Sequence, residues 1–109
     1  MDFQTRQAIR QFSDKVTERF DVSHLVLFGS RARGDNRDDS DADVAVFLRG
    51  ASGDFVEVKL AMVGIAFDVL VDTGIRIQPL PVWEGEWEHP ENYSNPYLLK
   101  NIAKDGVSI

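Results

Sequence analysis

Residues 25–48 read LVLFGSRARGDNRDDSDADVAVFL, and this stretch decides the fold. An apolar run ends at the small pair Gly29-Ser30, and ten residues later the acidic residues Asp41 and Asp43 open a second apolar run. Short apolar runs that end at glycine or polar residues are typical of buried strands. The two strands predicted here are His24–Phe28 and Val44–Leu48.

Helical patterns lie on both sides of this stretch. Apolar residues recur at spacings of three and four, with capping residues before them and glycines or prolines at their ends. The predicted helices are residues 2–20 with Asp2 as N-cap, a short helix over Ser30–Arg33, a long helix over Asp54–Thr73 stopped by Gly74, and a last helix that Ser94 or Asn95 caps, Pro96 opens and Gly106 ends.

Two segments between Ala66 and Leu80 have more than one possible secondary structure or extent. Ala66–Asp72 also alternates like a strand, although three turns of helical spacing and two stop signals favour the helix. We predict a third strand over Ile75–Leu80, where Pro79 and Pro81 confine it to a sheet edge or end it. Asp35–Ser40 is predicted as a polar loop, and Val82–Tyr93 as a loop with a short helical turn.

Composition narrows the class of protein. The 109 residues suit one domain over 1–109, and 43 % apolar with 28 % charged residues is ordinary for a soluble protein. Absence of cysteine excludes disulfides and thiolate metal sites. With no apolar run near the roughly 20 residues that span a bilayer and no signal peptide, a cytoplasmic location is expected. The net charge of −6 argues against direct nucleic acid binding.

The Gly29-Ser30 pair favours an anion at the end of the first strand. Glycine lets a ligand approach the backbone closely, and amides that open a helix point toward an anion. The Ser30 hydroxyl adds a donor. Taken alone, however, such a pair is more often only a tight turn with a capping serine.

Asp41 and Asp43 favour a metal ion. Side chains two apart on a strand point to the same face, where two carboxylates repel unless a cation lies between them. Such oxygen ligands suit Mg²⁺, which also takes phosphate oxygens and water. Taken alone, such a pair is more often the end of a solvated acidic loop. Arg31 and Arg33 lie where they could pair with the same phosphates, or simply with solvent and nearby aspartates.

Together these residues resemble the signature of the nucleotidyltransferase superfamily, which includes DNA polymerase β. The signature is Gly-Ser, ten residues, then Asp-x-Asp, and it is matched in full by Gly29-Ser30 and Asp41-Ala42-Asp43. The longer motif, which runs from Gly29 through Arg31 and Arg33 to Gly34 and is followed by Ser40-Asp41, is similar to that of the minimal nucleotidyltransferases. The resemblance implies an α/β (α+β) domain with a small mixed β-sheet flanked by helices. It also implies that Asp41 and Asp43 are the catalytic residues and hold Mg²⁺, and that the Gly29-Ser30 turn holds the substrate ATP.

The resemblance also implies a partner. Minimal nucleotidyltransferases resemble antitoxins that transfer AMP from ATP to a small helical HEPN-type toxin. Because the sequence lacks an obvious second domain for a small substrate, a protein acceptor is expected. An inactive module that neutralises its toxin by binding alone is the alternative, a transferase for RNA ends or a small alcohol is disfavoured, and an oligomer is compatible with the sequence.

One position departs from the family pattern. Active members carry a third carboxylate on the strand after the long helix, and on the predicted strand the matching residue is Gln78. If Ala66–Asp72 were a strand, Asp68 or Asp72 would take this place. We expect no catalytic role for His24 or His89, and core packing in preference to a partner-binding patch for the two tryptophans, Trp83 and Trp87.

Overall fold

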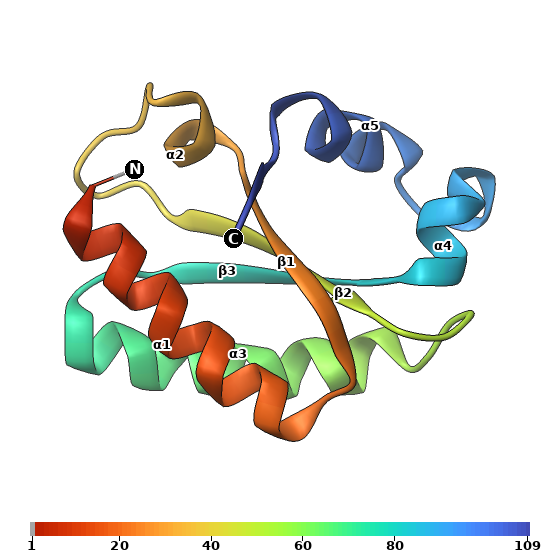
Figure 1. Ribbon diagram of the computed structural model, residues 1–109, viewed down its shortest axis with the longest axis horizontal. Coiled ribbons are helices and arrows are strands. Elements are labelled where there is room, and N and C mark those ends of the chain that lie inside the picture. Colours follow the sequence, from red (N-terminus) through yellow and green to blue (C-terminus); the bar gives the residue numbers. More distant parts are fainter. Residues whose placement is uncertain (1) are drawn as a thin grey trace.

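The computed structural model describes residues 2–109, in which helices and strands alternate along the chain (Figure 1). In chain order the elements are α1 (Phe3–Arg19), β1 (Val22–Phe28), α2 (Ser30–Arg33), β2 (Ala42–Leu48), α3 (Phe55–Thr73), β3 (Ile77–Trp83), α4 (Glu84–Glu88), the 3₁₀ turn η1 (Pro90–Asn92), α5 (Pro96–Asp105) and β4 (Val107–Ser108). The predicted α/β class is confirmed.

The four strands form one mixed sheet in the order β3-β2-β1-β4. β1 runs antiparallel to β2 and to β4, whereas β2 and β3 are parallel. A parallel pair needs a crossover connection, and α3 supplies it between β2 and β3. The small mixed sheet flanked by helices is therefore confirmed as well.

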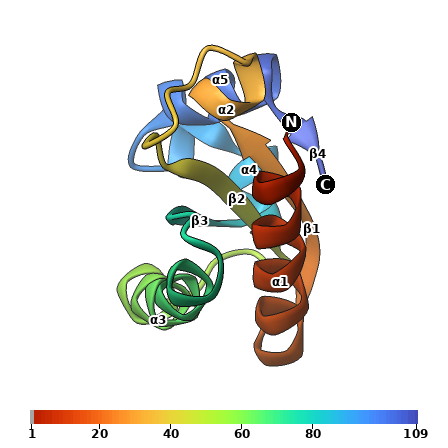
Figure 2. The same cartoon turned by 90° about the vertical axis from the view of Figure 1, so that its left-hand side faces the viewer.

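Helices cover both faces of the sheet. Val44, Val46 and Leu48 of β2 belong to the larger apolar core, which α1 and α3 complete. Ala45 and Phe47, which alternate with them, belong to a second cluster with Leu99 and Ile102 of α5. Figure 2 shows α1 and α3 side by side, with α2 and α5 together toward the opposite end of the view.

Side-chain caps fix where the long helices begin. Asp2 accepts a hydrogen bond from the Thr5 N–H at 2.7 Å, Asp54 from the Glu57 N–H at 3.1 Å, and Asn95 from the Leu98 N–H at 3.3 Å. Such caps each contribute about 1 kcal/mol. The three predicted caps are confirmed, with Asn95 chosen over Ser94 for α5.

The alternative strand over Ala66–Asp72 is wrong, because α3 is helical without a break to Thr73 and ends at Gly74. Its buried residues, which include Met62, Ile65 and Val69, follow helical spacing. The alternation that suggested a strand comes from Phe67 and Val71, which are exposed.

The third strand is longer than predicted. It spans Ile77–Trp83 in place of Ile75–Leu80, so the predicted loop does not begin at Val82. β3 lies at an edge of the sheet, where the missing N–H groups of Pro79 and Pro81 leave no ladder bond unmade. The two-residue strand β4 was not predicted, because two residues are too few to show alternation.

The two tryptophans pack against other side chains of the fold. Trp83 lies in the larger core, and Trp87 is half-buried with its ring edge-to-face on Phe47 at 5.0 Å, so the prediction of core packing is confirmed. His24 stacks on the same ring at 4.3 Å, and His89 is exposed beside Glu91. Within residues 2–109, no helix is both long enough and apolar enough to span a membrane.

Candidate functional site

The two aspartates lie where the sheet brings its strand ends together. Asp43 on β2 pairs with Phe28 at the end of β1 and with Gln78 on β3. It alternates with Ala42 and Val44, which face α1 and α3, so Asp43 lies on the opposite face. Asp41 precedes β2 by one residue. The predicted acidic pair is thus brought next to the turn after β1 and to the start of β3.

Gly29 lies directly against the carboxylate of Asp43. Its φ of +76° is a conformation that favours glycine, and a Cβ atom there would overlap Oδ2 of Asp43. The next residue, Ser30, opens α2, in which the Ala32 and Arg33 N–H groups both bond to the Gly29 carbonyl at 3.1 Å. The predicted turn and the predicted carboxylate therefore form one continuous surface.

The electrostatic environment of Asp43 favours the binding of a positive charge. Burial raises the pKa of the Asp43 carboxyl, and the negative charge of Asp41 raises it further. Arg33 and Lys59 act in the opposite direction without cancelling the effect. A half-buried carboxylate beside a second carboxylate is stabilised by a cation that binds both.

Lys59 is a site residue that the sequence interpretation missed. It projects from α3, and its ammonium group donates a hydrogen bond to the carbonyl oxygen of Pro79 on the sheet edge, next to Gln78. Burial lowers the pKa of Lys59, and the nearby Asp43 partly restores it. No sequence signal pointed to Lys59, because its approach depends on how α3 packs against β3.

The two arginines occupy different environments. Arg31 is buried and donates to Thr5 Oγ1 at 2.9 Å, to the Ser40 carbonyl at 2.9 Å and to the Asp38 carbonyl at 3.1 Å. Its guanidinium group thus ties the start of α1 to the loop before β2. Arg33 is exposed, pairs with Asp35 at 3.2 Å and lies 3.9 Å from Asp105. Of the two, Arg33 is the one that lowers the pKa of Asp43.

The position expected for a third carboxylate holds an amide. Gln78 pairs in register with Asp43, and its side chain is exposed. Asp68 and Asp72 lie on α3, both exposed, and Asp72 accepts a hydrogen bond from Gln11 at 2.7 Å. Within residues 2–109, no group of three or more His, Cys, Asp or Glu side chains is placed to hold a metal ion.

Two hollows border this region along α3 and β3. One, of about 340 Å³, is lined by Asp41 together with Arg31, Arg76 and the end of α3. A second, of about 240 Å³, lies between α3 and β3 and reaches Gln78. Together they give open space beside Asp41 and beside Gln78.

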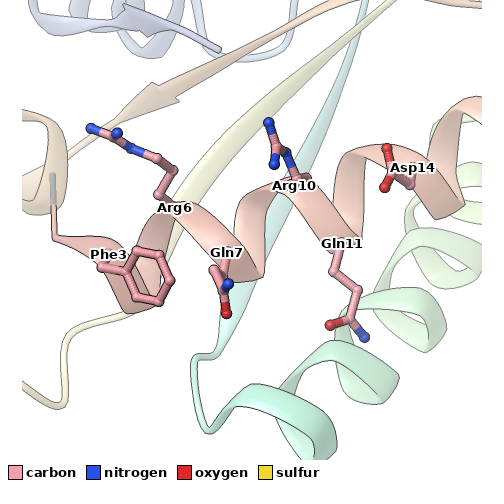
Figure 3. A pocket seen from close by; sticks show the side chains of 6 residues that line it. All are labelled: Phe3, Arg6, Gln7, Arg10, Gln11 and Asp14. Carbon is pink, nitrogen blue, oxygen red and sulfur yellow. The ribbon is translucent and has the colours of Figure 1, made fainter.

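A further hollow, of about 540 Å³, lies along α1 away from all of these residues (Figure 3). Figure 3 shows Arg6 and Arg10 on one side of α1 and Gln11 turned toward α3. It is lined by α1 side chains alone and contains none of the predicted site residues. Its size alone therefore does not make it the functional site.

Comparison with known proteins agrees with this geometry. A sequence profile described as a nucleotidyltransferase domain matches residues 9–108, which include the Gly29-Ser30 turn and both aspartates. The chain belongs to the nucleotidyltransferase domain family. Membership supports nucleotidyl transfer as the general chemistry, and members of the family generally use a nucleoside triphosphate and a divalent metal.

This nucleotidyltransferase domain also resembles a solved structure. A protein from Sulfolobus solfataricus, proposed to be a nucleotidyltransferase, superimposes with a TM-score of 0.55 at 23 % sequence identity. The match covers 99 % of this chain and 86 % of that one. At this identity the likeness supports the fold alone. No curated protein matches the chain.

Proposed function

We propose that this domain is a magnesium-dependent nucleotidyltransferase that uses ATP and transfers AMP to a hydroxyl group of a partner protein, with pyrophosphate as the leaving group. The observation that carries the proposal is the contact between the Gly29 backbone and the Asp43 carboxylate. It brings a turn suited to phosphate and a carboxylate suited to a metal onto one surface. Family membership supplies the class of reaction.

The residues present fit one divalent ion. Mg²⁺ in phosphate-handling sites is commonly held by one or two carboxylates, with substrate phosphates and water completing the octahedron. Asp41 and Asp43 supply two carboxylates, and burial together with the charge of Asp41 raises the pKa of Asp43, so a cation bound to both would be stabilising. When bound, the ion would neutralise the charge that develops on the phosphates.

The chain's own groups would bind and orient the triphosphate. The Ser30 hydroxyl and the backbone N–H groups at the start of α2 are candidates to donate to phosphate oxygens. Arg33 and Lys59, both within electrostatic reach of Asp43, add positive charge from opposite sides of the strand. Arg31 instead holds the loop that carries Asp41, as its bonds to Ser40 and Asp38 indicate.

Gln78 limits what the domain can do to the acceptor. Its amide can accept a hydrogen bond from an acceptor hydroxyl but cannot take the proton at neutral pH. The proton would then pass to the acceptor protein or to solvent. This arrangement suits a protein acceptor that completes the site.

The partner that we propose is a small helical toxin of the HEPN class, which the AMP group would silence. The acidic balance of the chain, −6 overall, suits a basic RNA-binding protein of this kind. The domain would then act as an antitoxin.

The test has two stages. Calorimetry measures ATP binding with and without Mg²⁺ to the wild type and to the Asp41→Asn/Asp43→Asn double variant. We expect magnesium-dependent binding that the variant loses. A HEPN-type helical protein encoded by a gene next to that of this chain is then co-expressed with each chain and weighed by mass spectrometry, and the mass of AMP should be added only with the wild type. A folded wild type that neither binds ATP nor modifies its neighbour rejects the proposal.

A second candidate, neutralisation by binding alone, is favoured by one observation: Gln78 occupies the strand position paired with Asp43. In that case the double variant would still bind and neutralise the toxin. Growth of cells that express the toxin with the double variant separates the two candidates, because transfer requires the aspartates and simple binding does not.

A further inference from the structure

One side of α3 exposes a continuous apolar stripe. The exposed fractions are 65 % for Val56, 65 % for Leu60, 43 % for Val63, 62 % for Phe67 and 68 % for Val71. Spacings of three and four place these side chains on one face of the helix. The opposite face of α3 packs into the core, so the helix is apolar on both sides. A helix of this kind is normally covered on both sides.

The stripe lies on the outside of the molecule. In Figures 1 and 2, α3 forms an outer border of the fold, with α1 and the sheet on its inner side. Between Lys59 and Asp68 the helix contains no charged residue. An exposed apolar surface of this extent marks a contact site for another protein.

Four of the five stripe residues are arranged symmetrically about one point of the helix. Around the midpoint between Val63 and Gly64, Val56 mirrors Val71 and Leu60 mirrors Phe67. A two-fold axis through that midpoint would place each of these side chains opposite an apolar side chain of an antiparallel copy. Self-complementarity of this kind is what a closed two-fold interface requires.

Gly64 provides the space that such a crossing needs. A Cβ atom at Gly64 would meet nothing within 4 Å, so the helix surface is open at the midpoint. The side chain of Val63 from a second copy would fill this opening. Close approach of two helices at a small residue, with larger residues on both sides, is a common packing geometry.

We propose that α3 pairs antiparallel with α3 of a second copy, through the stripe Val56, Leu60, Val63, Phe67 and Val71 centred on Gly64. At 1.5 Å per residue the paired segment is about 22 Å long. The pairing does not depend on nucleotidyl transfer. Val63 and Phe67 also line the hollow that reaches Gln78, so the second copy would border that hollow.

Charges beside the stripe give the pairing a recognisable salt dependence. Glu57 and Asp68 are exposed along one side of it, and a two-fold axis brings that side against itself. Like charges then oppose one another, and added salt screens their repulsion. Self-association should therefore tighten as salt rises. A partner with a basic flank would instead bind more weakly.

Sedimentation equilibrium of the full chain tests the proposal. We expect a species of twice the 12.3 kDa chain mass to form as the protein concentration is raised to roughly 100 μM. Leu60→Lys and Phe67→Glu should each weaken the dimer more than about tenfold, because each buries an unpaired charge. Circular dichroism checks that both variants remain folded. Tyr97→Glu is the matched control, since Tyr97 is 74 % exposed but lies on α5, and it should leave the dimer intact.

Mixing the two variants tests the register. In a mixed dimer the ammonium group introduced at position 60 faces the carboxylate introduced at position 67, while the other Leu60 and Phe67 pair is native. We expect an equal mixture to recover the dimer. Any one of four results would overturn the proposal. The wild type could stay monomeric, the single variants could remain dimeric, the mixture could stay monomeric, or added salt could weaken the association.

Discussion

A Cβ atom on Gly29 would overlap Oδ2 of Asp43, so the turn after β1 and the carboxylate on β2 are in direct contact. The contact joins residues fourteen apart in sequence, one directly after β1 and the other on the adjacent antiparallel strand β2. Any ligand that bridges the two must lie close to the glycine backbone. Residue size at position 29 should therefore control the site more than residue polarity does.

Gly29→Ala should abolish magnesium-dependent nucleotide binding. Alanine at Gly29 must take a φ of +76° and also displace the Asp43 carboxylate. Gly34→Ala is the matched control, because Gly34 has a φ of +81° but a Cβ there meets nothing within 4 Å. Both variants should lose about 1 kcal/mol or more of unfolding free energy from backbone strain. Calorimetry should show lost binding in the first alone, and equal binding in both would contradict this account.

Asp43→Asn should stabilise the metal-free protein at neutral pH. Since the pKa of Asp43 is raised in the folded state, the unfolded chain loses this proton first as the pH rises. The free energy of unfolding therefore falls as the pH increases above 3.8, the ordinary value for this carboxyl. The asparagine variant lacks this loss, so its melting temperature should exceed that of the wild type at pH 7.

Thermal melts at several pH values check this prediction. The difference between Asp43→Asn and wild type should close as the pH falls below 3.8, where the carboxyl is protonated in both states. Asp14→Asn, an exposed change on α1, should show no such trend. Mg²⁺ with ATP should reverse the order by stabilising the wild type alone. Identical melting curves for wild type and Asp43→Asn at all pH values would be the contrary result.

Arg31→Ala should destabilise the fold by about 3 kcal/mol, because it leaves the buried Thr5 hydroxyl and the half-buried Ser40 carbonyl without their donor. Arg31→Lys should not restore the loss, since one ammonium group cannot reproduce the guanidinium fork. Arg37→Ala, in the same loop but exposed, should change stability by less than about 0.5 kcal/mol. Urea unfolding of the three variants measures these differences. A stable Arg31→Ala protein with lost ATP binding would return Arg31 to a phosphate-binding role.

What the sequence could reveal depends on how local each feature is. The caps Asp2 and Asp54 bond to N–H groups three residues away, so their pattern is visible in the chain. The bonds of Arg31 reach Thr5, twenty-six residues earlier, and are invisible until α1 packs beside the loop. Lys59 likewise approaches Asp43 only because α3 lies along the edge strand. The acidic pair and Arg33 were visible in the sequence, whereas the burial of Arg31 and the approach of Lys59 were not.

The same distinction explains β3. Prolines usually stop a strand, and Pro79 and Pro81 made the prediction end at Leu80. The strand continues to Trp83 because its outer edge pairs with no other strand, so the missing donors leave nothing unsatisfied. Strand order, which the chain does not display locally, decides whether a proline ends a strand.

Gln78→Glu should convert the site toward a three-carboxylate one. The new carboxylate would lie beside Asp43 in the parallel register, so at neutral pH the metal-free protein should lose stability through like-charge repulsion. Divalent ions should then bind more tightly, and any AMP transfer should accelerate by about 100-fold or more if a general base is what the wild type lacks. Gln7→Glu, the same change on α1, is the control and should alter neither property.

Calorimetric titration with Mg²⁺ and thermal melts with and without the ion measure the Gln78→Glu effect. Unchanged ion affinity would mean that the position 78 side chain points away from the aspartates. Tighter ion binding without faster transfer would instead mean that the acceptor protein already supplies the base. That second outcome favours a site completed by its partner, because the geometry around Asp43 would then bind metal fully and still depend on the acceptor for proton removal.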